Sequence, residues 1–161
     1  MLQKALLSVT TTVLLLLVGC AVQTVPPGAS REEVIALYGK PSREVPLPSG
    51  SRLQYSRQPS GHSAVMVDLD ATGRVVAVRQ VMNPSDFARV VPGQWTRADT
   101  EREFGRPAFT DQVASWTGDI MTYRWRDSTG FDMFFWVYLD PANVVRRTGQ
   151  GMEIKSKGFD D

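Results

Sequence analysis

The chain has 161 residues, of which 42% are hydrophobic and 22% are charged, with 18 basic and 17 acidic side chains. These proportions are typical of a globular protein and exclude a wholly disordered chain. Because the charges balance, neither nucleic acid nor an anionic lipid surface is indicated as a general partner.

The first 19 residues have the features of an export signal. Lys4 precedes an apolar region that ends in Leu17-Val18-Gly19-Cys20, where small residues stand at the end of the segment. Ser8 and Thr10-Thr11-Thr12 interrupt the region, whereas a transmembrane helix needs about 20 continuous apolar residues. Cys20 is the only cysteine, so a disulfide within one chain is excluded.

Leu17-Val18-Gly19-Cys20 resembles the lipobox of bacterial lipoproteins. The resemblance implies cleavage before Cys20 and attachment of acyl chains, detectable as palmitate, to that residue, and several chains make a stable anchor. Ala21 stands where enterobacterial lipoproteins of the inner membrane carry Asp. We therefore expect a signal peptide at 1–19, a lipidated cysteine with a short tether at 20–25, and a location on the periplasmic face of a Gram-negative outer membrane.

The rest of the chain shows internal similarity at an offset of 70 residues. Leu53-Gln54-Tyr55-Ser56 corresponds to Tyr123-Arg124-Trp125-Arg126, and Val67-Asp68-Leu69-Asp70 corresponds to Val137-Tyr138-Leu139-Asp140. The pattern predicts two repeats, at 26–82 and 91–150. Between them lies a linker at 83–90, whose Asn83-Pro84-Ser85-Asp86 is typical of a turn, and a tail follows at 151–161.

Each repeat is predicted to begin with a helix. In the first, Ser30 and Glu33 form a capping box, the helix buries Val34, Leu37 and Tyr38, and Gly39 ends it. In the second, Thr96-Arg97-Ala98-Asp99 caps well, although the apolar face of the first helix is largely absent.

Extended segments follow each helix. In the first repeat we expect strands at 52–56, 64–70 and 74–81, with a hairpin turn at Asp70-Ala71-Thr72-Gly73. The second repeat has Asp140-Pro141-Ala142-Asn143 as the equivalent turn. The predicted fold is therefore α+β, with two tandem repeats of a helix followed by an antiparallel meander and with the helices packed on one face of the sheets.

This arrangement resembles the BamE family (SmpA/OmlA domain) of outer-membrane lipoproteins. The residues that carry the resemblance are Gly28, Tyr38-Gly39-Lys40-Pro41, Tyr55, Val67-Asp68-Leu69-Asp70 and Gly73. Assembly factors of that family usually carry one such domain, and the tandem pair is similar to the β-lactamase inhibitor protein fold. The resemblance implies a role in outer-membrane protein assembly or in envelope maintenance.

Two possible sites are disfavoured by spacing. A phosphate loop ending at Gly39-Lys40 would need Gly at position 34 and Ser or Thr at position 41, where Val34 and Pro41 stand. A calcium loop beginning at Asp68 would need a glutamate where Arg79 stands.

His62, the only histidine, lies in a loop-type segment without a second histidine or a spare cysteine to complete a zinc site or a Cys-His pair. Any two acidic side chains of the chain can in principle come together in the fold as a hydrolytic pair, but the spacing of acids in the sequence does not indicate one. We expect no enzyme activity, no metal and no cofactor apart from the covalent lipid on Cys20.

The clearest functional signal is an asymmetry between the repeats. Along 131–140, Phe131, Met133, Phe135, Val137 and Leu139 alternate with Phe134, Trp136 and Tyr138, whereas the first repeat has Ala64, Met66 and Asp68 at the latter positions. We call Phe134, Trp136 and Tyr138 the aromatic face. Arg124 and Arg126 flank it, and these residue types are enriched in interface hot spots.

Two uses of this face, and one structural alternative, follow from the sequence. The first is a binding module for an envelope protein, held at the membrane by its lipid. The second is an inhibitor-like module that occludes a periplasmic hydrolase. The alternative is burial of the rings against the other repeat, the Trp95 and Trp116 segments or the tail; contact with the membrane interface is a smaller possibility.

Overall fold

The computed structural model describes residues 25–154. The signal peptide at 1–19, Cys20 and the rest of the tether up to Thr24 lie outside the described residues, as does the tail from Lys155. Within residues 25–154, every helix is too short and too polar to cross a membrane.

The protein is α+β, with two four-stranded antiparallel sheets and few helices. The first sheet has the strand order β1-β2-β3-β4 and the second has the order β5-β6-β7-β8. The elements of the first half are α1 (Arg31–Tyr38), β1 (Arg43–Leu47), β2 (Gly50–Ser56), β3 (Ala64–Asp70) and β4 (Val75–Gln80). Those that follow are α2 (Pro84–Phe87), α3 (Arg97–Phe104), β5 (Phe109–Asp111), β6 (Ile120–Arg126), β7 (Asp132–Leu139) and β8 (Val145–Met152).

Both long helices begin at the predicted caps. The Ser30 hydroxyl accepts from the Glu33 amide, and the Glu33 carboxylate accepts from the Ser30 amide, which completes the capping box. Thr96 and Asp99 form the same arrangement at α3. Each helix ends at a glycine with positive φ, Gly39 or Gly105.

The predicted strands β3 and β4 are confirmed within one residue, but β1 was missed. Its sequence, Arg43-Glu44-Val45-Pro46-Leu47, contains a proline that argues against a central strand. The structure places it at the edge of the first sheet, where a missing amide donor is tolerated.

A short helix, α2, occupies the segment predicted as a turn or linker. Asn83 caps it by accepting from the Asp86 amide. Phe87, at its end, is 2% exposed and stacks on Phe135 of the second sheet, with the ring centroids 4.0 Å apart. The connection between the halves therefore supplies a core side chain.

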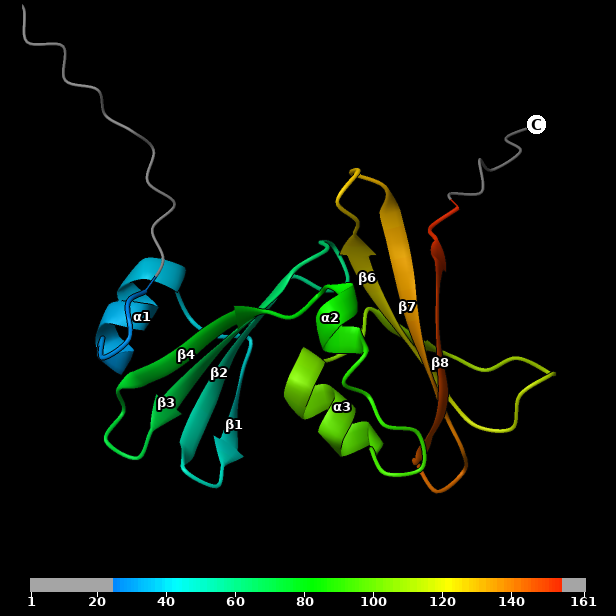
Figure 1. The fold of residues 1–161 in the computed structure, drawn as a ribbon, viewed down its shortest axis with the longest axis horizontal. Helices are drawn as coiled ribbons and strands as arrows, with labels where there is room; N and C mark the ends of the chain where they lie inside the picture. Colours follow the sequence, from blue (N-terminus) through cyan, green and yellow to red (C-terminus); the bar gives the residue numbers. More distant parts are fainter. Residues whose placement is uncertain (1–24, 155–161) are drawn as a thin grey trace, which may run out of the picture.

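The helices and sheets alternate along the molecule, in the order α1, first sheet, α3 with α2, second sheet (Figure 1). Val34 of α1 packs with Val67 and Leu69 on one face of the first sheet. Ala64 and Met66, on the opposite face, belong to the core shared with α2, α3 and the second sheet. The expectation that helices lie on one face only is therefore wrong for the first sheet, whose two faces are both covered.

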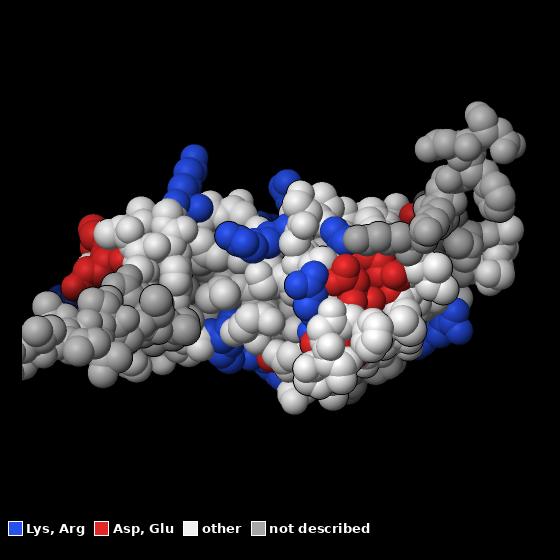
Figure 2. All heavy atoms as spheres, turned by 90° about the horizontal axis from the view of Figure 1, so that it is seen from above, with Lys and Arg blue, Asp and Glu red and all other residues white. Residues whose placement is uncertain are grey.

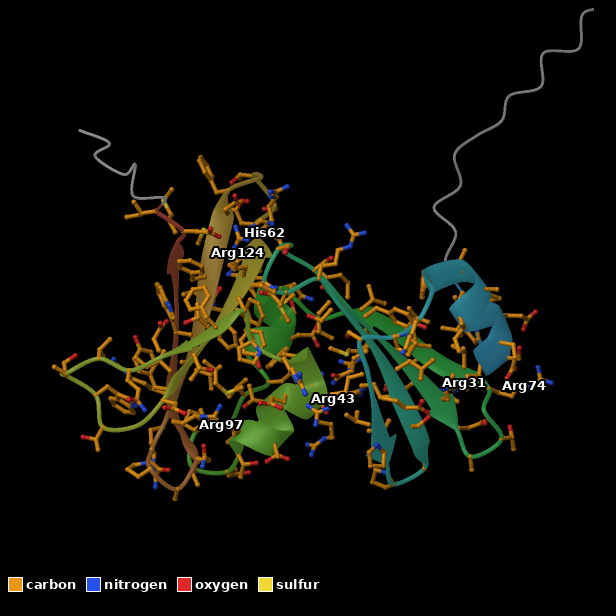
Figure 3. The ribbon with its side chains drawn as sticks, turned by 180° about the vertical axis from the view of Figure 1, so that it is seen from behind. Arg31, Arg43, His62, Arg74, Arg97 and Arg124 are labelled. Carbon is orange, nitrogen blue, oxygen red and sulfur yellow. The ribbon has the colours of Figure 1, made fainter. Side chains whose placement is uncertain are left out.

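Polar contacts join α3 to the first sheet. Gln54 Nε2 donates to the carbonyl oxygens of Glu101 and Arg102, at 2.9 and 3.0 Å, and Arg52 Nη1 donates to the latter at 3.0 Å. Arg43 reaches from β1 toward α3 and pairs with Glu101 at 2.9 Å (Figure 3). These bonds reach carbonyl groups in the last turn of α3, where the Glu101 carbonyl also accepts from the Gly105 amide at 2.9 Å.

Two expected core residues are exposed. Leu37 of α1 is 39% exposed, so this helix buries only Val34 fully. Phe131 is 56% exposed because it precedes β7, in the β6–β7 turn. Of the other predicted core positions of β7, Phe135, Val137 and Leu139 are confirmed at no more than 1% exposed, whereas Met133 is only partly buried against this core.

Candidate binding face

The aromatic face lies on the side of the second sheet that is turned away from α3. The three side chains alternate with the buried Phe135 and Val137 along β7, the strand between β6 and β8. Each is partly exposed. Register places Thr122 and Gly149 on either side of Trp136.

Other aromatic rings pack at both ends of this row. Phe134 lies 5.9 Å from Trp136 and meets Phe109 of β5 edge to face at 5.6 Å. Tyr138 meets Trp116 edge to face at 5.3 Å. The rings therefore support one another in geometries that aromatic pairs prefer, and Trp136 stands in the middle of the row.

Glycines on β8 make room for the central indole. A Cβ atom at Gly151 would lie 2.7 Å from Cη2 of Trp136, closer than real Cβ contacts allow. A Cβ atom at Gly149 would lie 3.5 Å from Cε3 of Trp136, at ordinary van der Waals distance. The ring consequently lies along the backbone of the neighbouring strand, and Gly151 is required for this position.

Arg147 and Trp116 hold the other end of the aromatic face. The Arg147 guanidinium carbon lies 3.9 Å from the centroid of Tyr138 and 5.1 Å from that of Trp116, which are cation–π distances. Trp116 Nε1 also donates to the Leu139 carbonyl at 2.7 Å. This end of the face is therefore preorganised, with a basic group at its rim.

The two arginines predicted to flank the face lie beside it but are held by acids of the same chain. Arg124 is directly opposite Phe134 and forms a bidentate pair with Glu153, at 2.7 and 2.8 Å. Its hydrogen bond with Glu153 raises the pKa of Arg124 above its usual value. Arg126 donates to Asp132 at 2.8 and 2.9 Å.

A cluster that sequence reasoning missed surrounds His62. Its Nε2 lies 3.4 Å from Asp132 Oδ1 and 3.7 Å from Glu153 Oε2, and one ligand atom from each of the three residues lies within 4.8 Å of the others. Figure 3 shows His62 and Arg124 close together, and Figure 2 shows basic and acidic side chains intermingled at this end of the molecule.

Geometry and charge make this cluster a poor cation site. Both carboxylates are already bound by arginines, so a metal ion would have to displace two guanidinium groups. The chemistry is that of a structural ion-pair network linking the β2–β3 loop to the second sheet. His62 is at least 70 residues away in sequence from Asp132 and Glu153. No local sequence pattern predicts a contact between residues so far apart in the chain.

A cavity of about 340 Å³ lies beside the C-terminal end of α1, away from the aromatic face. Its lining combines two phenols, hydroxyl groups, two cations and one apolar side chain, from Tyr38, Lys40, Ser42, Tyr55, Ser56, Arg57, Ser63 and Val65. This lining has the character of a polar surface hollow. Tyr55 is fixed there by donating to the Gly39 carbonyl at 3.1 Å.

The candidate site is therefore the aromatic face, built from β7 and supported by β5, β8 and the segment around Trp116. Comparison with protein-family models, with curated proteins and with solved structures found no match to this chain.

Proposed function

We propose that this protein is a lipoprotein of the outer membrane, anchored on the periplasmic side through Cys20, whose aromatic face binds another envelope protein. The proposed location and lipid anchor rest on Lys4, the apolar region and Leu17-Val18-Gly19-Cys20. The binding role rests on the aromatic face. The process served would be outer-membrane protein assembly or envelope maintenance.

The observation that carries the binding role is the partial exposure of Phe134, Trp136 and Tyr138 in one supported row. Large rings that are already fixed lose little conformational entropy when a partner covers them. Trp and Tyr are also the residue types most often found at interface hot spots. A partner that covers Trp136 would gain apolar contact at the centre of the patch, with Arg147 at its rim.

We further propose that the two halves are tandem repeats of the BamE type. Three correspondences support this. Both helices have capping boxes. Both cap residues form isolated bridges to the residue just before the last strand of their sheet, Ser30 with Arg74 and Thr96 with Val144. The amides of Gly28 and Gly93 donate to the carbonyls of Val75 and Val145, each at 2.7 Å.

We propose that the protein acts by holding the aromatic face close to the membrane. A lipid anchor confines the protein to two dimensions close to the membrane, and this raises the effective concentration of the face for partners there. The short segment between Cys20 and Val25 limits how far the folded part extends from its anchor. No chemical step is required of the side chains.

Photo-crosslinking in living cells tests the binding role. A photoreactive phenylalanine analogue at position 136 is expected to capture a discrete protein, whereas the same group at Val91, which is 41% exposed and distant in sequence from the face, is not. Only intrachain adducts, or no adducts, from position 136 would refute the proposal.

Metabolic labelling tests the proposed lipid anchor at Cys20. Cys20→Ala should abolish incorporation of radioactive palmitate and leave the uncut precursor, because the acceptor thiol is lost. Ala21→Ser keeps Cys20 and serves as the matched control, with labelling retained. Continued labelling of the Cys20→Ala protein would contradict the lipid anchor.

A further inference from the structure

The contact between α3 and the first sheet suggests a partner for the aromatic face. In this contact, the last turn of α3 packs on the side of the first sheet that carries Arg52, Gln54 and Met66. An addition of 70 to these residue numbers gives Thr122, Arg124 and Trp136, all on the aromatic side of the second sheet. The aromatic face is thus the positional equivalent of a surface that is covered by a helix within this chain.

Among residues 25–154, no helix covers the aromatic face (Figure 1). The layers run helix, sheet, helix, sheet, so the molecule ends in α1 on one side and in the aromatic face on the other. Stacked repeat arrays normally end in polar capping surfaces. The aromatic face is not such a surface, and on α1 the exposed Ala36 and Leu37 are apolar, although the exposed Glu32 and Glu33 lie in the first turn of the same helix.

Two positions near the end of α1 are apolar where the equivalent positions of α3 are charged. Counting from the glycine that ends each helix, Ala36 and Leu37 of α1 correspond to Arg102 and Glu103 of α3. Glu103 is 9% exposed and lies 3.1 Å from Arg52 of the first sheet. The two α1 residues are instead exposed to solvent.

The equivalent surfaces of the two sheets also differ in polarity. The first sheet meets the charged α3 with Arg52, Gln54 and Asp68, whereas the second sheet has Thr122, Arg124 and Tyr138 there and Trp136 in place of Met66. A polar helix thus packs on a polar sheet face inside the chain. An exposed apolar pair on α1, Ala36 and Leu37, and an aromatic sheet face remain, one at each end.

We propose that the partner of the aromatic face is a second copy of this chain, whose α1 docks on Trp136 as α3 docks on the first sheet. This inference rests on the proposed binding role of the aromatic face. The contact joins different surfaces of the two copies, so it is heterologous and head-to-tail, and it generates rings or open chains. Docking covers Ala36 and Leu37 with the rings of the second sheet.

Photo-crosslinking followed by peptide mapping tests this inference with the full-length lipoprotein, in cells and in detergent. The photoreactive analogue at position 136 is expected to give an adduct of two copies, attached within residues 31–39. Leu37→Glu places a charge against the rings and should lower the yield of this adduct on the order of tenfold or more. Val91→Glu is the matched control, because Val91 has nearly the same exposure, at 41% against 39%.

The possible outcomes separate this inference from the proposed function. An adduct with a different protein would overturn the second copy as partner and leave the binding role intact. An adduct within the same chain, to residues 155–161 for example, or to lipid, would overturn both.

Mixing two variants tests the head-to-tail geometry. Leu37→Glu blocks the helix end of one copy, and Gly149→Glu adds a charge beside Trp136 on the other, with its Cβ atom at van der Waals distance from the indole. Each variant alone should be monomeric in light scattering, with an unchanged far-ultraviolet circular dichroism spectrum. A mixture should form a species of two copies, because one intact end remains on each variant; a mixture that stays monomeric would refute the geometry.

Discussion

The buried side chain of Arg52, which pairs with Asp68 in the first sheet and also reaches α3, gives the sharpest test of how the two halves are held together. Arg52 Nε and Nη2 donate to the two oxygens of Asp68 at 2.5 and 2.9 Å, and Nη1 donates to the Arg102 carbonyl of α3. The side chains are only 5% and 16% exposed. Arg52→Met keeps an unbranched side chain as far as the position of Nε and removes the charge and all three hydrogen bonds.

The expected cost follows from what the substitution leaves behind. Removal of one partner from a buried ion pair costs about 3–5 kcal/mol, because the other charge remains without compensation. Glu103, also 3.1 Å from Arg52, keeps Arg79 and Arg89 at 3.5 and 3.7 Å, so only Asp68 loses its principal partner. We therefore expect the lower end of the range, about 3 kcal/mol, or a fall in melting temperature of about 6–12 °C for a chain of this size.

Arg31→Met is the matched control. Arg31 pairs with Glu44 at 2.7 Å, but these side chains are 41% and 42% exposed. The exposed pair should contribute much less to stability than the Arg52 pair, because solvent screens its charges. Urea unfolding of both variants, followed by tryptophan fluorescence, measures the difference; equal free energies of unfolding for the two variants would refute the argument from burial.

Two further predictions concern the core and the turns. Phe87→Ala should lower the free energy of unfolding by about 3–5 kcal/mol in the same assay, because its ring is buried against Phe135, and a cost below about 1 kcal/mol would show α2 to be a dispensable connection. Acid should also destabilise the protein, because hydrogen bonds from the Arg74 and Val144 amides lower the pKa values of Asp70 and Asp140 below 3.8 in the folded state. The stabilisation is present above this value and is lost as the pH falls through the folded pKa values, so melting temperatures measured from pH 7 to pH 2 should drop at the acid end. The drop should be smaller in the Asp70→Asn/Asp140→Asn double variant, and an identical drop would count against these turns as its source.

The sequence predicted those features that depend on neighbouring residues. The capping boxes at Ser30 and Thr96 and the hairpin turn at Asp70 involve residues within four positions of one another, so their chemistry is visible in the order of residue types. Alternation along β7 likewise separated the core positions from the aromatic face, because successive side chains of a strand point to opposite sides.

Features that depend on distant contacts were not predicted. Arg124 was expected to be available to a partner, but Glu153, 29 residues away, binds it through two hydrogen bonds. Leu37 was assigned to the core by helical spacing, yet it is exposed, because Val34 and in part Tyr38 are the α1 side chains that pack against the first sheet. Periodicity identifies an apolar stripe but not how much of it the packing covers.

The sequence by itself determined the α+β class, the ends of α1 and α3, and the three rings that share one side of β7. Only the tertiary structure decided that α3 lies between the two sheets, that His62 joins Asp132 and Glu153, and that glycines on β8 leave room for Trp136. The physical reason is distance along the chain. Hydrogen bonds and side-chain periodicity within an element are set by adjacent residues. Which segments cover a sheet face depends instead on tertiary packing, and the sequence of a strand does not specify which segments pack against it.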